Sequence, residues 1–340
     1  MFINYLEKIV ARRNLSLEEM ETAMNIIMEG GATDSQLAGF LVGLSMKGET
    51  IDEITAAARV MRDKAISIKS NRDLIDSCGT GGDCKGTFNI STTVALLMAA
   101  AGLNVAKHGN RSVSSKSGSA DLLEALGVNI NLSPDQAEQC LDEIGIAFLF
   151  APHFHRAMKH AAGPRKELGV RTIFNILGPL TNPARTKYQV MGVYDPELVS
   201  PLAAVLRNLG VKSAMVVHGA GGIDEFSLAG ENRVAYLHNV EIAEFYRSPE
   251  GLGLERVGLE ELLGGTAEKN KEITLAILKG ERGAKRDVVL FNTAAAFLVT
   301  GLADDWREGI ELAAEMIDSG KALRKLEEMI EYTNSLEVVL

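Results

Sequence analysis

The chain has few cysteines and no long apolar run, and each scarcity excludes a class of protein. The three cysteines, Cys78, Cys84 and Cys140, are an odd set without a CxxC pair, so a reducing compartment is favoured and a structural zinc site is not. The most apolar stretch, residues 94–103, is about half as long as a membrane-spanning helix. The charged N-terminus also lacks the three-part pattern of a secretory signal. We therefore expect a cytoplasmic protein with no membrane segment.

Positive charge is scarce as well. The 340 residues include 45 Asp and Glu but 35 Lys and Arg, for a net charge of −10. This balance disfavours a nucleic-acid partner, which would need a basic surface. A phosphorylated small molecule is still compatible, because backbone N–H groups, a few local cations and a metal ion act at short range. The length favours two domains, with a single large α/β domain as the alternative.

Residues 1–70 have only helical signals. The capping-box pattern, a hydroxyl residue followed three positions later by Glu or Gln, recurs at Ser16, Thr33 and Thr50. Apolar residues at helical spacing follow each of these starts. We expect a small helical domain over residues 1–70, joined by part of the Gly- and Pro-containing segment 163–183, with an apolar side suited to self-association.

From Arg72 the pattern changes to alternating strands and helices. Strands are expected at residues 74–75, 103–106, 146–150, 188–193 and 214–217, with short strands near Val234 and Val240. Helices are expected at residues 153–162 and 197–209, and from Ser133, Thr266, Ala284, Asp304 and Lys321. This alternation predicts an α/β domain over 71–340 with a mostly parallel sheet.

The first strand runs into a glycine loop, CGTGGDCKGTFNIST, which opens a helix. It is not a dinucleotide fingerprint, because Cys84 replaces the third glycine, and it lacks the Lys-Ser/Thr pair of a Walker loop. A tight turn that needs glycine for backbone geometry alone is the alternative. The helix start at Asn89 favours phosphate binding instead, since its N–H groups and positive dipole end attract anions. Ser91 is suited either to cap this helix or to ligate Mg²⁺.

The second strand runs into residues 107–119, which are rich in serine and in which Lys107, Arg111 and Lys116 would supply positive charge to a bound anion. Such a loop is often merely solvated. Here it follows a strand next to the glycine loop, and ligands bind at the carboxyl ends of parallel strands. A third loop carries Asp224 and Glu225; paired carboxylates facing a phosphate pocket would need a cation such as Mg²⁺ between them.

Two further features concern a possible carboxylate ligand and a possible metal. The guanidinium of Arg165, in GPRKE, suits a carboxylate ligand, although a helix-end ion pair is the alternative. His153, His155 and His160 are close in sequence but lack an acidic or cysteine partner at metal-ligand spacing, so packing or pocket-wall roles are favoured.

Together, GTGGD, TFNIST, KHGNRSVSSKSGSADLLEALG, GPRKELGVRTIFNILGPLTNP and GIDEFS resemble the anthranilate phosphoribosyltransferase family across essentially the whole chain. The resemblance implies a small helical domain plus a larger α/β domain of the nucleoside phosphorylase/phosphoribosyltransferase class. It also implies dimerisation through the helical domain and phosphoribosyl transfer to anthranilate in tryptophan biosynthesis, with Mg²⁺ as cofactor.

The same resemblance assigns residues to ligands. Phosphoribosyl pyrophosphate (PRPP) is expected to be held by Gly79, Gly82, Asp83, Thr87, Asn89, Ile90, Ser91, Thr92, Lys107, Ser115 and Ser119. Anthranilate is expected to contact Gly79, His108, Asn110 and Arg165, with His155 beside its path. Mg²⁺ is expected at Ser91, Asp224 and Glu225.

The chain departs from the family pattern at Cys84, where the family commonly has glycine, so the conformation of the loop tip is open. No general base is evident. A pyrimidine nucleoside phosphorylase is a rival reading, but that family has different loop motifs and longer chains. A non-catalytic relative that binds nucleic acid is another; it should have lost Asn110 and Arg165, which are present here.

Overall fold

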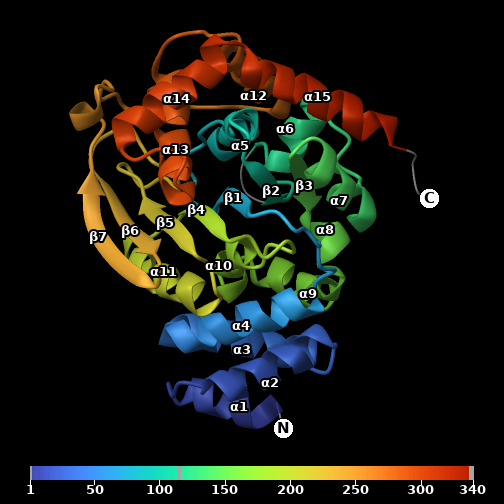
Figure 1. Cartoon of the computed structure of the whole chain (residues 1–340). Helices are drawn as coiled ribbons and strands as arrows, with labels where there is room; N and C mark the ends of the chain where they lie inside the picture. The colour runs from blue at the N-terminus through green and yellow to red at the C-terminus, as the bar shows by residue number, and fades with distance from the viewer. Residues whose placement is uncertain (1, 113–115, 337–340) are drawn as a thin grey trace.

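The computed structural model describes residues 2–112 and 116–336, and within them a helical bundle packs beside a seven-stranded sheet (Figure 1). The bundle contains α1 (Phe2–Val10), α2 (Leu17–Met28), α3 (Asp34–Lys47) and α4 (Ile51–Lys64). The three predicted capping boxes are confirmed: each hydroxyl accepts from the N–H three residues on, whose side chain accepts in return. These reciprocal bonds determine where α2, α3 and α4 begin.

The sheet has the strand order β3-β2-β1-β4-β5-β6-β7. Its strands are β1 (Leu74–Gly79), β2 (Asn104–Gly109), β3 (Ile146–Phe150), β4 (Tyr188–Gly192), β5 (Ser213–His218), β6 (Asn232–His238) and β7 (Glu241–Arg247). Pairing is parallel from β3 through β5 and antiparallel between β5, β6 and β7. The prediction of a mostly parallel sheet is therefore confirmed. The strand expected near Val240 begins one residue later, because Asn239 and Val240 form a two-residue turn with φ of 47° and 71°.

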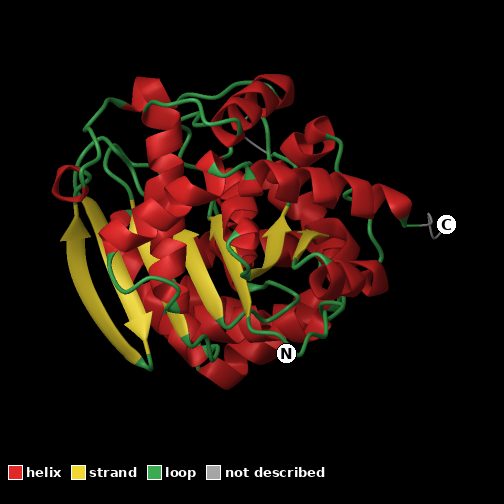
Figure 2. Cartoon of the chain, turned by 45° about the horizontal axis from the view of Figure 1, so that its top comes forward, coloured by secondary structure: helices red, strands yellow, loops and turns green. Residues whose placement is uncertain are grey.

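Helices cover both faces of the twisted sheet, as Figure 2 shows. One core contains Met215 and Val217 of β5, whereas Ala214 and Val216 belong to the other, as the two-residue period of a strand requires. The first core is closed by α5 (Ile90–Ala100), α6 (Ser119–Leu126), α7 (Pro134–Glu143), α12 (Ala267–Leu278), α13 (Ala284–Thr300), α14 (Trp306–Asp318) and α15 (Lys321–Ser335). The second is closed by α11 (Val199–Asn208), α10 (Ile173–Leu180) and the bundle.

The helix expected over residues 153–162 is wrong in extent. The chain forms α8 (Ala151–Phe154), a 3-10 turn (Arg156–Met158) and α9 (Lys159–Leu168). The break falls at His155, whose backbone is non-helical (φ −107°, ψ 57°) and whose ring is buried beside His108. After the break, α9 packs on α2 and α3, and α10 packs on α3 and α4, between the bundle and the sheet in Figure 1.

In residues 2–112 and 116–336, no helix combines the length and the apolar character that a membrane crossing requires.

Candidate active site

The three loops singled out from the sequence lie at the carboxyl ends of the parallel strands. From β1 the chain moves outward to β2 and β3, then returns to β4 on the other side of β1. The crevice at such a reversal is where open α/β sheets bind ligands. The glycine loop follows β1, the serine-rich loop follows β2, and Asp224 and Glu225 follow β5. The topology therefore places all three at one edge of the sheet.

Two paired glycines let the loop after β5 reach across the strand ends. Gly79 of β1 pairs with Gly192 of β4. A Cβ atom on Gly79 would lie 2.2 Å from Asp224 Oδ2, and one on Gly192 would lie 1.5 Å from the Asp224 carbonyl oxygen. Larger residues would exclude Asp224 from this position. In the gap, Gly81 N–H donates to Asp224 Oδ2 at 2.7 Å, so the carboxylate is bonded to the glycine loop itself.

The N-terminus of α5 is held by groups from other segments. The N-cap position is Asn89, whose side chain makes no capping bond, and Ser91 lies inside the first turn, so Ser91 is not the cap of this helix. Instead, Ser91 N–H donates to Glu225 Oε1 at 3.2 Å. Ile90 is buried, and Thr92 Oγ1 is buried without a hydrogen-bond partner in the part of the chain that the structure describes. The positive end of α5 thus faces the same crevice as Asp224 and Glu225.

Lys107 is a buried cation beneath the loops. Its Nζ donates to the Ser77 carbonyl at 2.7 Å and to Ser91 Oγ at 3.4 Å. Asp76 is fully buried nearby and accepts from Asn182 Nδ2 at 2.8 Å. Burial raises the pKa of Asp76, and the positive charge of Lys107 opposes that rise. These contacts fix the ammonium group next to Ser91.

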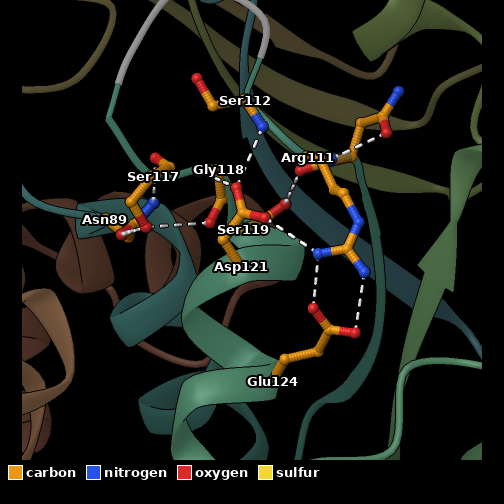
Figure 3. Close-up of polar contacts among 9 residues, drawn as sticks. Asn89, Arg111, Ser112, Ser117, Gly118, Ser119, Asp121 and Glu124 are labelled. Carbon is orange, nitrogen blue, oxygen red and sulfur yellow. Dashed lines mark hydrogen bonds and ion pairs between the residues drawn. The ribbon is translucent and has the colours of Figure 1, made fainter. Parts of the chain in front are cut away.

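The serine-rich loop is braced through Arg111, which Figure 3 shows turned toward α6. Arg111 Nη1 donates to Asp121 Oδ1 at 3.0 Å, and Nη2 donates to Glu124 Oε1 at 2.8 Å. Asp121 also accepts from the N–H groups of Ser112 and Gly118. The expectation that Arg111 supplies charge to a bound anion is therefore replaced by a role in holding the loop. Ser119 begins α6 and donates through Oγ to the Asn110 carbonyl at 3.3 Å.

The outer part of the glycine loop contains three more residues that are predicted to bind PRPP, namely Gly82, Asp83 and Thr87. Gly82 has φ of +77°, a conformation that favours glycine. Asp83 Oδ1 accepts from Lys85 N–H at 3.1 Å, and Thr87 forms an isolated bridge with Leu263. Cys84 is exposed at the tip with φ of +56°. Ser115 lies outside the described residues.

Two buried histidines, His108 of β2 and His155 directly after α8, line the crevice on the side of these elements. The rings of His108 and His155 are 5.1 Å apart, and each has an Nε2 atom with no partner within residues 2–112 and 116–336. Burial lowers the pKa of His108 to about 3, with a further contribution from His155, and burial lowers the pKa of His155 to about 4. Both rings are therefore neutral at pH 7.

Arg165 lies on α9, and Asn110 lies just after β2. The Arg165 guanidinium stacks 5.0 Å from the centre of the Phe174 ring, and burial lowers its pKa. Within the described segments the guanidinium makes no ion pair or hydrogen bond, so the helix-end salt bridge considered as an alternative is absent there. Asn110 is exposed, and its Oδ1 accepts from Arg111 N–H at 2.7 Å. The Arg165 side chain is therefore held by its aromatic neighbour and not by an opposite charge.

The acidic residues fit a divalent cation. Burial, followed by repulsion from Asp83, raises the pKa of Asp224; burial, followed by the charge of Asp224, raises the pKa of Glu225. Crowded carboxylates beside a hydroxyl are the oxygen ligands that Mg²⁺ prefers. Across the described residues, no group of three or more His, Cys, Asp or Glu is arranged to hold a metal by itself. A site that Mg²⁺ shares with substrate phosphates meets both observations.

Some supporting residues gave no clear signal in the sequence. Asn270 of α12 donates through Nδ2 to Asn89 Oδ1 at 2.8 Å, although the two residues are 181 positions apart. Asn182 bonds Asp76 and also the Ala106 carbonyl at 2.8 Å. Asn182 lies within the long GPLTNP motif, which was a usable signal. Asn270 gave no such signal, because it stands inside a charged amphipathic helix.

Known proteins are similar to this chain over nearly its full length. It matches the family model described as "Glycosyl transferase family, helical bundle domain" over residues 3–65 and the one described as "Glycosyl transferase family, a/b domain" over residues 71–323. The anthranilate phosphoribosyltransferase of Petrotoga mobilis is 64% identical over an alignment 340 positions long, which covers 99% of this chain and 98% of that protein.

Solved structures are similar over the same extent. The anthranilate phosphoribosyltransferase of Thermus thermophilus superposes with a TM-score of 0.92 at 44% identity, covering 97% of this chain and 99% of that one. The Saccharomyces cerevisiae protein in complex with PRPP and Mg has a TM-score of 0.90 at 29% identity, with 98% of both chains covered.

Proposed function

Because this chain belongs to the anthranilate phosphoribosyltransferase family, we infer that it transfers the 5-phosphoribosyl group from PRPP to the amine of anthranilate. The products are N-(5-phosphoribosyl)anthranilate and pyrophosphate, and the step belongs to tryptophan biosynthesis. The observation that carries this function is the meeting of the glycine loop, the α5 N-terminus and buried Lys107 in one crevice. Such a set of N–H groups and one cation suits a pyrophosphate.

The reaction is a displacement at C1 of the ribose. The C1–O bond to pyrophosphate breaks, the C1–N bond to the amine forms, and the amine loses a proton. We assign PRPP, the phosphoribosyl donor, to a set of residues from the glycine and serine-rich loops and the start of α5: Gly79, Gly82, Asp83, Thr87, Asn89, Ile90, Ser91, Thr92, Lys107, Ser115 and Ser119. The fixed N–H dipoles and the ammonium of Lys107 stabilise the charge that develops on the leaving group, because they need no reorganisation during reaction.

Mg²⁺ is the cofactor of this reaction, and we assign Ser91, Asp224 and Glu225 to hold it. When bound, it supplies positive charge to the pyrophosphate oxygens and so favours departure of the leaving group. Gly81 N–H and Ser91 N–H orient the two carboxylates. Lys107, which reaches Ser91 Oγ, brings a second positive charge to the same place.

On the acceptor side, we assign Gly79, His108, Asn110 and Arg165 to anthranilate, with His155 beside His108. A guanidinium without an ion-pair partner in the described residues is suited to the anthranilate carboxylate. Neutral histidine rings supply a wall that does not compete for that negative charge. Orientation of the amine toward C1 is a proximity effect.

The test is a direct assay of purified protein. Anthranilate fluorescence should fall on mixing with PRPP and Mg²⁺, and the fall should stop with EDTA and be absent without PRPP. A folded protein that binds PRPP but consumes no anthranilate would refute the proposed acceptor, and other aromatic amines would then be screened.

The assembly is a separate part of the proposal. We propose a cytoplasmic homodimer that pairs through the bundle. Ile3 and Val10 of α1 and Met46 of α3 are 53%, 71% and 69% exposed, and α1 packs on α3. Exposed apolar side chains gathered on neighbouring helices favour association. Light scattering of the protein should give twice the mass of one chain. The double variant Val10→Glu with Met46→Glu should give the mass of a single chain.

We also retain the division into a helical domain over residues 1–70, joined by part of 163–183, and an α/β domain over 71–340. It is supported by the packing of α9 and α10 against the bundle helices.

A further inference from the structure

A short segment far along the chain runs antiparallel to the glycine loop. Thr87 and Leu263 form an isolated bridge. Phe88 N–H donates to the Leu262 carbonyl at 3.2 Å, and Gly264 N–H donates to the Gly86 carbonyl at 2.9 Å. The last turn of the glycine loop before α5 is therefore paired with residues 262–264.

Asn270, one turn into α12, ties this segment to the start of α5. Its Oδ1 accepts from Gly265 N–H at 2.8 Å, and its Nδ2 donates to Asn89 Oδ1 at 2.8 Å. The same Asn89 amide donates through Nδ2 to the Ser117 carbonyl at 3.2 Å. Asn89 Oδ1 accepts from Asn270 Nδ2 and, at the longer distance of 3.3 Å, from Ser117 Oγ, and these two bonds fix which way the Asn89 amide faces. The side-chain NH₂ group of Asn89 is thereby directed at the serine-rich loop, whose Ser117 is labelled beside Asn89 in Figure 3.

The fit between these parts is close. Asn270 is 1% exposed. A Cβ atom on Gly264 would lie 2.6 Å from Asn270 Oδ1 and 2.6 Å from Phe88 Cα. Glycine at position 264 is thus needed for the segment to reach the loop.

We propose that residues 262–264 and Asn270 form a clamp that sets the geometry of the PRPP site, with Asn270 as a positioning residue acting through Asn89. The proposal rests on the proposed function and deepens it. The clamp holds the glycine loop and, through Asn89, the serine-rich loop in one arrangement. Among the residues described, it makes no hydrogen bond or ion pair with the acceptor-side residues Arg165 and His155. Its loss should therefore weaken donor binding selectively.

The first test compares two buried polar residues of α12. Asn270→Ala removes the bonds to Gly265 and Asn89. Thr274→Ala is the matched control: Thr274 is fully buried one turn on, and its hydroxyl lies 3.3 Å from that of Thr93 in α5. We expect Asn270→Ala to raise the KM and Kd for PRPP about three- to tenfold. The KM for anthranilate should change less than about twofold, and Thr274→Ala should leave both KM values near wild type.

The second test approaches the clamp from its other side and guards against misfolding of Asn270→Ala. Gly264→Ala places a methyl group against Phe88 and Asn270. Gly265→Ala makes the same change one residue on, where the methyl meets only the Lys269 side chain at 3.1 Å. The first variant should raise the PRPP KM more than the second.

Equal changes in both KM values, or equal effects of the variants within each pair, would overturn the clamp. Binding of PRPP is measured by calorimetry, which separates this proposal from the assigned reaction. If wild type binds PRPP but leaves anthranilate unchanged, the proposed function fails, and the Kd comparison still decides the clamp.

Discussion

The side of the crevice assigned to PRPP, here the donor side, and the side assigned to anthranilate, the acceptor side, differ in how their polar groups are held. On the donor side, Asp224, Glu225 and Lys107 are each bonded to another segment of the chain. On the acceptor side, His108 and His155 have Nε2 atoms without partners in the described residues. Arg165 rests on an aromatic ring there.

This difference indicates two ways of preparing a site. A buried polar group without a partner costs free energy, so natural structures leave few of them. Apart from Thr92 Oγ1 and Asp83 Oδ2, which are buried without partners in the described residues, the polar groups of the donor side are held in advance, as stabilisation of a leaving group by fixed dipoles requires. The acceptor side keeps unused hydrogen-bonding capacity, which a bound carboxylate and amine would use.

The largest effect should follow from breaking the donor side. Asp224→Asn with Glu225→Gln keeps the volume but removes two negative charges. We expect kcat/KM to fall about 100-fold or more, because Mg²⁺ loses two of its three assigned protein ligands. The Mg²⁺ concentration for half-maximal rate should rise as well. Glu231→Gln, at an exposed position, is the control. An unchanged Mg²⁺ requirement would refute the assignment of these carboxylates.

A smaller and one-sided effect should follow at Arg165. Arg165→Ala should raise the KM for anthranilate about 10- to 100-fold, the range expected for hydrogen bonds to a charged group. The Kd for PRPP should change less than about twofold. Lys166→Ala, at the exposed neighbouring position, should match wild type. Parallel losses for both substrates would mean that the two sides of the site are not separable.

The sequence predicted the architecture well, and it singled out the loops that the structure brings to one edge of the sheet, because local chemistry carries that information. Glycines at a strand end, a helix start at Asn89 and the Asp224-Glu225 pair each have a recognisable pattern. Capping boxes likewise placed the bundle helices. The site assignments themselves stay predictions until tested by substitution.

Pairing between distant segments was not predictable in the same way. Arg111 was expected to face an anion, but two carboxylates of α6, 10 and 13 residues on, neutralise it. The helix break at His155 depends on the ring of His108 from another strand. Asn270 looked like an ordinary helix residue. Each outcome depends on which charges and rings meet in three dimensions, which neither helical periodicity nor motif spacing records.

The acceptor-side histidines should make stability depend on pH. Their pKa values of about 4 for His155 and about 3 for His108 lie below the unfolded value of about 6.5. Below pH 6.5 the unfolded chain binds protons that the folded chain does not, so stability should fall as the pH drops toward 4.

The effect should be about 1–2 kcal/mol per histidine between pH 7 and pH 5. Urea unfolding at both pH values measures it, and His155→Gln should reduce the loss relative to wild type. His160→Gln, at an exposed position, is the control. If His155→Gln leaves the pH dependence unchanged, the histidine is not neutral in the folded protein.

The smallest effect concerns the tip of the donor side, where Cys84 takes a left-handed conformation with φ of +56°. Cys84→Gly removes the backbone strain but makes the unfolded chain more flexible, and the two effects oppose each other. We expect Tm to change by less than about 2 °C and the KM for PRPP by less than about twofold. Cys84→Val should lower Tm and raise the KM for PRPP more than Cys84→Gly does, because a β-branched side chain is disfavoured at positive φ. A glycine variant that binds PRPP much more weakly than wild type would show that the Cys84 side chain, and not the backbone conformation alone, matters at the tip. The ordered donor side would then depend on a side-chain contact such as the one from Cys84 Sγ to the Gly82 carbonyl, 3.6 Å away.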